Sequence, residues 1–349
     1  MSASPSSAAS ASSTTGANPG ASRAPLNPPV RVRVGVLKLA SEGGAYIAQE
    51  RGYFKAEGLN VEFTPFSNGS QEIPLLASGQ LDIGSGSPDA NLMNAVQRDI
   101  DVKIVASYLL IRKDSTASGF VVRQDLIDSG AYKSPADLRG KTVGVSSRGG
   151  TGETYPEIVL AQGGLTADDV NMQTLPFADM VAALANKKLD AAWLAQPYVI
   201  NVEQQHIAKM VVPSGQILAG TNGLVMYMGG PFAQQNNEAA KRFVTAFLRG
   251  QRDYYTAFDL NQGSKDDILN ILAKYTTADP KTNAVLANNH ALGGVQPNGE
   301  LNTKWLDGLQ DDFMRLGSQK QRVDLSKALD HSYLDYAQQQ LGKVTDTAG

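Results

Sequence analysis

The stretch LASGQLDIG, residues 76–84, returns 108 residues later as LANKKLDAA, residues 184–192. Both stretches open with Leu-Ala and reach a Leu-Asp pair after the same interval. Two shorter matches occur in the same order along the chain: Val34–Val36 with Val143–Val145, and Pro65–Phe66 with Pro176–Phe177. Matches that keep their order at nearly one offset predict two copies of one structural unit.

Each copy alternates strand patterns with helix patterns. Residues 30–37, 59–63 and 81–85 are apolar or β-branched in the manner of strands, whereas residues 44–54 and 70–80 have the apolar spacing of helices. The second copy repeats this order, and the pattern after residue 230 is helical. Strands that alternate with helices predict parallel sheets. We therefore expect an α/β fold of two similar lobes, each with a mainly parallel sheet and flanking helices.

Composition excludes several classes of protein. The 349 residues include no Cys, so a disulfide, a thiolate metal site and a cysteine nucleophile are impossible. A net charge of −3 argues against a nucleic-acid partner, and no apolar run is long enough to span a membrane. The histidines, His206, His290 and His331, are dispersed. We expect no metal and no other cofactor.

Residues 1–29 differ from the rest of the chain. They are rich in Ser, Ala, Gly and Pro and carry one charge, on Arg23. Such a segment buries too little apolar surface to fold, which predicts a disordered tether. It is either a tether left after removal of a signal segment or the natural N-terminus of a cytosolic protein.

The loop GVSSRGGTGE, residues 144–153, combines glycines with hydroxyl side chains between a strand and a helix. The phosphate-loop pattern is incomplete, because Gly150 stands where the lysine belongs. The dinucleotide pattern is absent as well, since Tyr155 occupies the place of its last glycine. The loop therefore predicts a general anion site at a helix N-terminus.

Four stretches carry a resemblance to a known family: AYIAQERGYFKAEGLNVEF, LLASGQLDIGSGSPDA, SPADLRGKTVGVSS and LDAAWLAQPYV. Over roughly residues 31–260 the chain resembles the type II periplasmic solute-binding proteins of ABC importers, of the sulfonate, nitrate and taurine type. It also resembles the related binders of thiamine-pyrimidine precursors. The helix that ends in Gly-Tyr-Phe before an acidic-Gly-Leu-x-Val strand is the most specific of these signals.

The resemblance implies an architecture and a function. Lobe one would comprise residues 30–119 and 222–349, with the C-terminal helices, and lobe two residues 120–221. Two crossovers, near 118–121 and 220–223, would let the cleft close over a ligand. The implied protein is exported to the periplasm or cell surface, monomeric, lipid-anchored in its native form, and not an enzyme. It would deliver a small organic anion, a sulfonate or carboxylate that is aromatic or aliphatic, to an ABC permease; the alternative is an enzyme of this fold that acts on a pyrimidine or related cofactor precursor.

Ligands of open α/β sheets bind beyond the carboxyl ends of the strands, and this rule selects the candidate residues. They are Ser41, Glu42, Gly43, Gly44, Ser85, Ser87, Asp89, Tyr108, Arg112, Ser146, Ser147, Arg148, Thr151, Trp193, Gln196 and Asn222.

Some of these residues have two interpretations. Arg148 is expected to grip the anion through two hydrogen bonds, with Arg112 as a second positive charge, or else to be a solvated loop residue. Glu42 either faces water or meets an amine. Ser87 either caps a helix or contacts the ligand, and Trp193 either covers the ligand or packs between the lobes.

Overall fold

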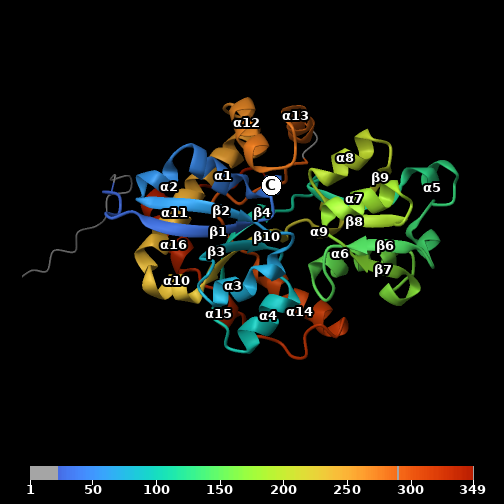
Figure 1. The fold of residues 1–349 in the computed structure, drawn as a ribbon, viewed down its shortest axis with the longest axis horizontal. Helices are drawn as coiled ribbons and strands as arrows, with labels where there is room; N and C mark the ends of the chain where they lie inside the picture. The colour runs from blue at the N-terminus through green and yellow to red at the C-terminus, as the bar shows by residue number, and fades with distance from the viewer. Residues whose placement is uncertain (1–22, 289–290, 349) are drawn as a thin grey trace, which may run out of the picture.

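The computed structural model describes residues 23–288 and 291–348, which form two five-stranded sheets (Figure 1). The first sheet has the order β2–β1–β3–β10–β4 and the second the order β7–β6–β8–β5–β9. We call each sheet, with the helices packed on it, the first lobe and the second lobe. The first sheet contains β1 (Val30–Val36), β2 (Leu59–Pro65), β3 (Ile83–Gly86), β4 (Val102–Leu110) and β10 (Asn222–Gly229). The second contains β5 (Ser118–Arg123), β6 (Thr142–Val145), β7 (Asn171–Thr174), β8 (Ala191–Ala195) and β9 (Ala208–Pro213).

One strand in each sheet runs against the other four. β10 is antiparallel to β3 and β4, and β5 is antiparallel to β8 and β9. All other neighbouring strands are parallel. Each reversed strand is the first that the chain forms after it crosses from the other lobe. The mainly parallel, two-lobed α/β fold is therefore confirmed.

The internal repeat also holds in three dimensions. In the first lobe the Asp82 carboxylate accepts a hydrogen bond from the backbone N–H of Arg33, at 2.7 Å. Its counterpart in the second lobe, Asp190, accepts the same bond from the N–H of Thr142, at 3.0 Å. The Asp of each repeated Leu-Asp pair thus links the start of one strand to the neighbouring strand, β3 to β1 in the first sheet and β8 to β6 in the second.

Two segments connect the lobes, residues 111–117 and 214–221. They are hydrogen-bonded to each other: the N–H of Ile111 donates to Thr221 O (2.9 Å), and the N–H of Gly220 donates to Ile111 O (2.7 Å). The first lies just before the crossover expected near 118–121, because β5 already begins at Ser118, and the second overlaps the crossover expected near 220–223. The expected boundary between residues 119 and 120 therefore falls inside β5.

The helices surround the two sheets (Figure 1). The first lobe carries η1 (Ala40–Glu42), α1 (Gly43–Glu50), α2 (Tyr53–Ala56), η2 (Gly69–Gln71), α3 (Ile73–Ala77), α4 (Ala90–Gln97), α10 (Gly230–Gln235), α11 (Asn237–Tyr254), the π-helical turn η5 (Tyr255–Asp259), α12 (Lys265–Tyr275), α13 (Pro280–Asn288), α14 (Thr303–Arg315), α15 (Leu325–Ala328) and α16 (Ser332–Leu341). The second lobe carries α5 (Gln124–Asp128), η3 (Pro135–Leu138), α6 (Thr151–Gln162), η4 (Ala167–Asp169), α7 (Phe177–Ala185), α8 (Tyr198–Gln204) and α9 (Ser214–Leu218).

The helix expected over residues 44–54 is divided in two. Gly52 has a φ of 71° and separates α1 from α2, because a left-handed residue cannot continue a right-handed helix. The long helix α11 packs on α1 and is buried along one face, where Phe243 stacks on Phe54 with ring centroids 4.7 Å apart. Its aromatic residues are core residues, as their spacing predicts.

The expected tether is only partly described. Residues 1–22 lie outside the described residues. Residues 23–29 were expected to belong to the tether, but they rest on the first lobe. The N–H of Leu26 donates to Glu57 O at 3.2 Å, and the Arg242 side chain donates to Ala24 O at 2.7 Å. These backbone contacts explain why this end of the segment is ordered despite its composition.

Candidate functional site

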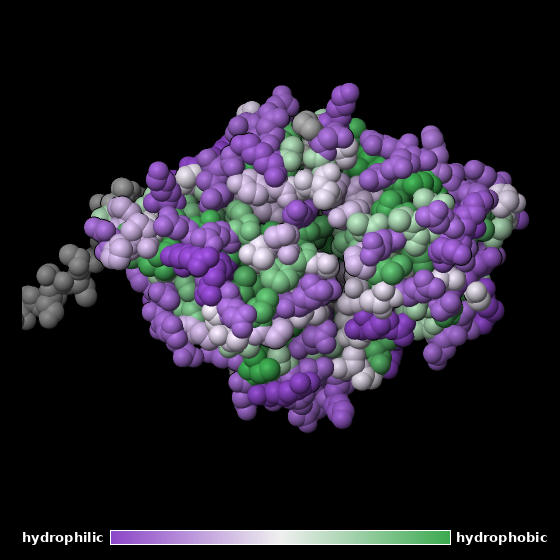
Figure 2. Space-filling view, viewed as in Figure 1, coloured by the Kyte–Doolittle hydropathy of each residue, from purple (hydrophilic) through white to green (hydrophobic). Residues whose placement is uncertain are grey.

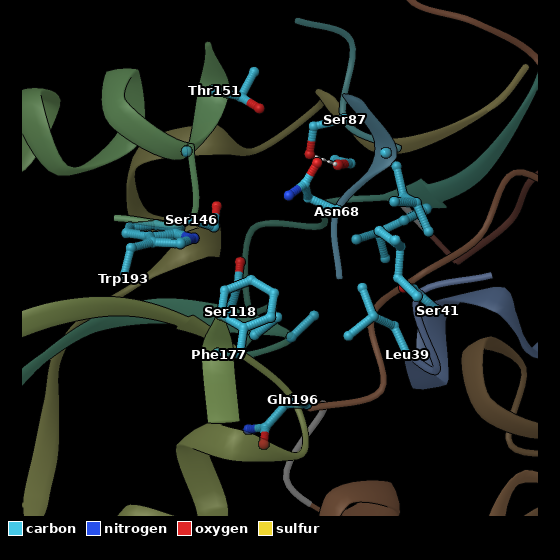
Figure 3. A pocket seen from close by; sticks show the side chains of 18 of the residues that line it. Leu39, Ser41, Asn68, Ser87, Ser118, Ser146, Thr151, Phe177, Trp193 and Gln196 are labelled. Atoms are coloured by element: carbon cyan, nitrogen blue, oxygen red, sulfur yellow. Dashed lines mark hydrogen bonds between the residues drawn. The ribbon is translucent and has the colours of Figure 1, made fainter. Parts of the chain in front are cut away.

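A cavity lies between the two lobes, where Figure 2 shows a narrow groove on one face of the molecule. It encloses about 950 Å³, including solvent at its mouth. The first lobe supplies a wall from Leu37, Leu39, Ala40 and Ser41 and a second loop from residues 67–70. The second lobe supplies the ends of β6 and β8 and the starts of α6 and α7 (Figure 3).

One end of the cavity is lined by hydroxyl groups around the N-terminus of α6. Ser146, Ser147 and Thr151 all line it. Gly152 makes this approach possible, since a Cβ on Gly152 would lie 2.5 Å from Ser146 Oγ and 2.6 Å from Ser147 Oγ. The first N–H groups of an α-helix lack partners one turn earlier. In α6 the N–H of Glu153 donates to Gly150 O at 2.9 Å, the Glu153 carboxylate accepts the N–H of Gly149 at 2.6 Å, and Gly150, at the N-cap, offers no side chain to the remaining N–H groups. Hydroxyl and N–H donors therefore converge here.

Aromatic side chains form the wall beside this end. Trp193 and Tyr155 lie with ring centroids 5.4 Å apart and their planes tilted by 55°. Phe177, at the start of α7, lines the cavity as well (Figure 3). The Tyr155 hydroxyl is buried and has no hydrogen-bond partner of good geometry. Burial raises the pKa of Tyr155, and the nearby Thr151 hydroxyl opposes that shift. The ring stays neutral and presents an unused polar group.

The described lining includes no Lys, Arg or His. Its one carboxyl group, on Asp89, caps α4 by accepting the N–H of Leu92 (3.0 Å) and also accepts the Ser70 hydroxyl (2.6 Å). Burial raises the pKa of Asp89, while these hydrogen bonds oppose that shift. A ligand in this cavity therefore meets neutral donors and aromatic surface, not a cation, among the described residues.

Half of the candidate residues line this cavity: Ser41, Ser87, Asp89, Ser146, Ser147, Thr151, Trp193 and Gln196. Ser87 is not the helix cap, because Asp89 caps α4. Instead the Ser87 hydroxyl donates to Gly223 O at 3.1 Å, which ties the end of β3 to the start of β10.

Neither candidate arginine lines the cavity. Arg148 is an ion-pair partner of Glu153, with Nη2 3.0 Å from Oε1, and its side chain is 54% exposed. Arg112 lies within the first crossover segment and pairs with Asp259 at 2.5 Å and Asp346 at 3.1 Å. The expectation that these side chains grip an anion is therefore corrected: each already has carboxylate partners outside the cavity.

Six further candidates lie behind the cavity wall, in the core of the first lobe. Gly43 and Gly44 face α11, where an added Cβ would meet Tyr254 and Gln251 at 2.7 Å. Tyr108 packs edge-on against Phe247, with ring centroids 4.9 Å apart. Gly43 and Gly44 do lie beyond the end of β1, whereas Tyr108 lies inside β4, and helix packing covers all three.

The other three form hydrogen bonds inside the first lobe. Glu42 is fully buried and accepts donors from the strand end before it, and Ser85 donates its hydroxyl to Glu42. Asn222 donates to the Ser107 hydroxyl at 2.9 Å and accepts the N–H of Asn302 at 2.6 Å. Glu42 therefore faces neither water nor a ligand amine.

Several lining residues were missed by the sequence analysis: Ser67, Asn68, Ser70, Ser118, Tyr155 and Phe177. Ser67, Asn68 and Ser70 follow the first Pro-Phe motif, and Phe177 belongs to the second; the two motifs lie at or just after the ends of β2 and β7. That repetition was a signal that these loops meet at the cleft. Tyr155 offered no such signal, because a tyrosine inside a helix is more often a core residue.

A family model described as NMT1/THI5 like matches residues 41–257. The chain belongs to the NMT1/THI5-like family. A Brucella abortus protein named "Putative binding protein" is 28% identical over 287 residues, which cover 80% of this chain and 83% of that protein. The formylaminopyrimidine-binding protein of Halalkalibacterium halodurans is 27% identical, over 65% of this chain and 64% of that protein.

Solved structures with lower sequence identity share the fold of this chain. The nitrate-binding protein NrtA of Synechocystis has a TM-score of 0.75 at 16% identity, over 90% of this chain and 89% of that one. The alkanesulfonate-binding protein SsuA of Xanthomonas axonopodis, bound to MOPS, has a TM-score of 0.70 at 18% identity, over 87% of this chain and 99% of that one. The desulfurization enzyme DSZB has a TM-score of 0.60 at 16% identity, over 88% of this chain and 98% of that one.

The described residues show neither a helix long and apolar enough to cross a membrane nor a group of three metal-ligating side chains.

Proposed function

We propose that this chain is the solute-binding component of an ABC importer, which captures a small organic anion in the cavity between its lobes and delivers it to a permease. The cavity carries the proposal, because both lobes contribute walls to it and two hydrogen-bonded crossover segments join them. Such a joint permits hinge closure around a ligand. Named binding proteins among its relatives support the same function.

The anion would be held without a positively charged side chain. Its charged head would lie against Ser146, Ser147 and the N-terminus of α6, where hydroxyl groups, N–H groups and the helix dipole favour negative charge. Its body would lie against Trp193 and Phe177. Asp89 stands in the same lining and disfavours a second negative charge, so a monovalent sulfonate or carboxylate with an aromatic or alkyl body fits best.

We further propose that the protein binds without catalysis. One solved DSZB structure is that of a variant in which serine replaces a cysteine, in complex with biphenyl-2-sulfinic acid. The present sequence contains no cysteine, and the described lining offers no histidine that could activate a serine. The relatives named as binding proteins favour the same conclusion.

The proposed place of work is outside the cytoplasm, in the periplasm or at the cell surface. Relatives of the same fold include periplasmic binding proteins. The proposal expects a monomer that meets its permease through both lobes, and a lipid anchor on the native form. Cell fractionation of the native host tests this: recovery in the cytosol would contradict it.

The first experiment is a thermal-shift panel of aromatic and alkyl sulfonates, monocarboxylates, dicarboxylates, nitrate and uncharged pyrimidines. A ligand that binds only the folded state raises the melting temperature with its concentration. We expect the largest shift from a monovalent organic anion that is recovered chemically intact. A shift from uncharged pyrimidines alone would replace the anion by a heteroaromatic ligand, and conversion of the ligand would establish an enzyme instead.

A further inference from the structure

Two carboxyl groups are buried together behind the first-lobe wall of the cavity. Glu42 ends η1, and Glu72 precedes α3; both residues have no exposed surface. Neither forms an ion pair within the described part of the chain. Burial of two unpaired carboxylates is very unfavourable, so the surroundings of each group decide which one carries charge.

Glu42 is surrounded by donors. Oε1 accepts the N–H of Leu37 at 2.9 Å and the hydroxyl of Ser85. Oε2 accepts the N–H of Leu39 at 2.9 Å and the hydroxyl of Tyr46 at 2.8 Å. Four donors aimed at two oxygens satisfy a carboxylate and leave no acceptor for a carboxylic proton. The geometry of Glu42 is that of an ionised group.

Glu72 has the opposite surroundings. Oε2 accepts one bond, from the N–H of Ser85 at 2.7 Å, while Oε1 is buried without a partner. The carboxyl group fills a socket between β1 and β3, where a Cβ on Gly35 would lie 2.6 Å from its carbon. Gly84 provides the other side of that socket. One donor and one unused oxygen suit a neutral carboxylic acid.

The internal repeat shows that the fold does not require an acid here. The offset of 108 that relates the Leu-Asp pairs places Met180 opposite Glu72. Met180 fills the corresponding socket in the second lobe, where a Cβ on Gly144 would lie 3.1 Å from its sulfur. An uncharged side chain thus occupies the equivalent place in the second lobe, which agrees with a neutral Glu72. The negative charge of the buried pair is then assigned to Glu42.

We propose that the two buried carboxyl groups share one negative charge, carried by Glu42, and that Glu42 is the positioning residue of the cavity wall formed by residues 37–41. The Glu42 carboxylate accepts the N–H groups of Leu37 and Leu39. These two hydrogen bonds fix the backbone after β1, which leaves the sheet and turns before Ser41 reaches the cavity. Both leucines and Ser41 line the cavity. The effect on a ligand rests on the proposed function; the charge assignment does not.

The electrostatics of Glu72 agree with its geometry as a neutral acid. Burial is the main cause that raises the pKa of Glu72, to about 9, and the charge of Glu42 raises it further. Burial also raises the pKa of Glu42, but all four of its donors oppose that shift. The other titratable groups that these carboxyls influence are the tyrosines Tyr46, Tyr108 and Tyr227, whose pKa values are raised by burial and which stay neutral.

The proposal is tested on the purified chain without ligand, with E42Q, E72Q and E72M variants. Infrared difference spectra at neutral pH should show a protonated buried carboxyl in the wild type that is absent from both Glu72 variants. Amide exchange followed residue by residue should accelerate at Leu37 and Leu39 in E42Q by roughly tenfold or more, the loss of a charge-assisted hydrogen bond. In E72Q these two amides should exchange as in the wild type.

Persistence of the carboxyl band in E72Q would overturn the charge assignment, and equal exchange in E42Q and E72Q would overturn the role of Glu42. If E42Q does not fold, Tyr46→Phe removes one of the four donors with little change of shape. It should raise the pH at which Glu42 takes up a proton, because a donor to the carboxylate is lost. An unchanged titration of Glu42 in that variant contradicts the proposal. None of these results depends on the identity of the ligand, so the proposed function stands or falls separately.

Discussion

Arg315 on α14 of the first lobe donates to Glu157 on α6 of the second lobe, with Nη1 3.1 Å from Oε2. The Glu157 side chain is 8% exposed and that of Arg315 55%. Nearby, a Cβ on Gly149 would lie 2.7 Å from Ser318 Cβ, so the two lobes touch along the same rim. The helix that presents the hydroxyl end of the cavity is therefore joined to the opposite lobe.

Arg315→Gln should weaken ligand binding. The ion pair exists only where the lobes meet, so its loss destabilises the closed form relative to the open one. A partly exposed pair contributes up to about 1 kcal/mol, which predicts a loss of up to roughly fivefold in affinity. Isothermal titration with the best ligand of the panel measures it, and faster dissociation should account for most of the change.

The matched control is Arg322→Gln. Arg322 lies in the same lobe and pairs with Asp307 and Asp311 at the surface, with no partner from the second lobe among the described residues. It should leave affinity unchanged. Equal losses of affinity in both variants would show that the net charge of the protein, and not the contact between the lobes, governs binding.

Gly152→Ala should abolish or strongly weaken anion binding. The added methyl group would lie 2.5 to 2.6 Å from the hydroxyl oxygens of Ser146 and Ser147, so both hydroxyls must turn away from the N-terminus of α6. We expect a loss of at least tenfold, about 1.4 kcal/mol, because more than one donor is displaced. Titration calorimetry measures the affinity, and circular dichroism checks that the helix is intact.

Gly164→Ala is unsuited as a control, because Gly164 has a φ of 69°. Gly308 lies within α14 with open space at its Cβ position, so Gly308→Ala is the suitable comparison. It should keep full affinity and gain a little stability, since Ala is the better helix former. Full binding by Gly152→Ala would exclude the proposed anion position.

Arg148→Ala should change affinity by less than about twofold, because Arg148 does not line the cavity and its 54% exposed side chain is screened by solvent, although its partner Glu153 is buried. Titration of the same ligand against this variant and against Thr151→Val separates the two parts of the loop. Thr151 lines the cavity, and its variant should bind more weakly. A tenfold loss in Arg148→Ala would mean that the arginine leaves Glu153 and turns inward when the ligand binds.

The repeat made the two similar lobes and their mainly parallel sheets predictable, because matched Leu-Asp and Val-Gly-Val motifs fall at matched places in the two sheets. The places of the crossovers came from the family resemblance, not from the repeat. The loops that carry the site follow from the same pattern. Which side chains point inward does not. Glu42 and Ser87 both follow strand ends, but one turns into the core toward Ser85 while the other reaches the cavity.

The arginines illustrate what the sequence could not show. Arg148 stands in a loop of glycines and hydroxyls, where a grip on an anion is the natural interpretation. Its partner Glu153 is five residues away and buried in the first turn of α6. Arg112 is bound by Asp259 and Asp346, which lie 147 and 234 residues further along the chain. Such partners become apparent only once the C-terminal helices are placed.

Tyr155→Phe should have opposite effects on stability and on binding. The hydroxyl is buried without a partner of good geometry in the ligand-free chain, so its removal should leave stability unchanged or raise it slightly. If the hydroxyl donates to the ligand, affinity should fall by roughly 0.5 to 1.5 kcal/mol. Chemical denaturation and titration calorimetry give the two numbers. A variant that loses stability and keeps its affinity would assign the hydroxyl to the fold alone.

Glu72→Gln should be increasingly more stable than the wild type as the pH rises. In the folded chain the pKa of Glu72 is raised from its usual 4.5 to about 9, mainly by burial. Between these values the unfolded chain has lost the proton while the folded chain keeps it. Stability therefore falls with rising pH over this range, by at most about 1.4 kcal/mol per pH unit. The decline begins above the unfolded pKa and ends near the folded one.

Glutamine does not titrate, so its variant lacks this contribution. Urea unfolding of both proteins at pH 5, 7 and 9 measures the difference, which should be smallest at pH 5 and largest at pH 9. Glu62→Gln is the control. Glu62 is exposed and pairs with Arg31, and this pairing lowers the pKa of Glu62, whereas burial raises that of Glu72. A constant difference between Glu72→Gln and the wild type across this range would mean that folding does not raise the pKa of Glu72, and the single shared charge of the buried pair would be excluded.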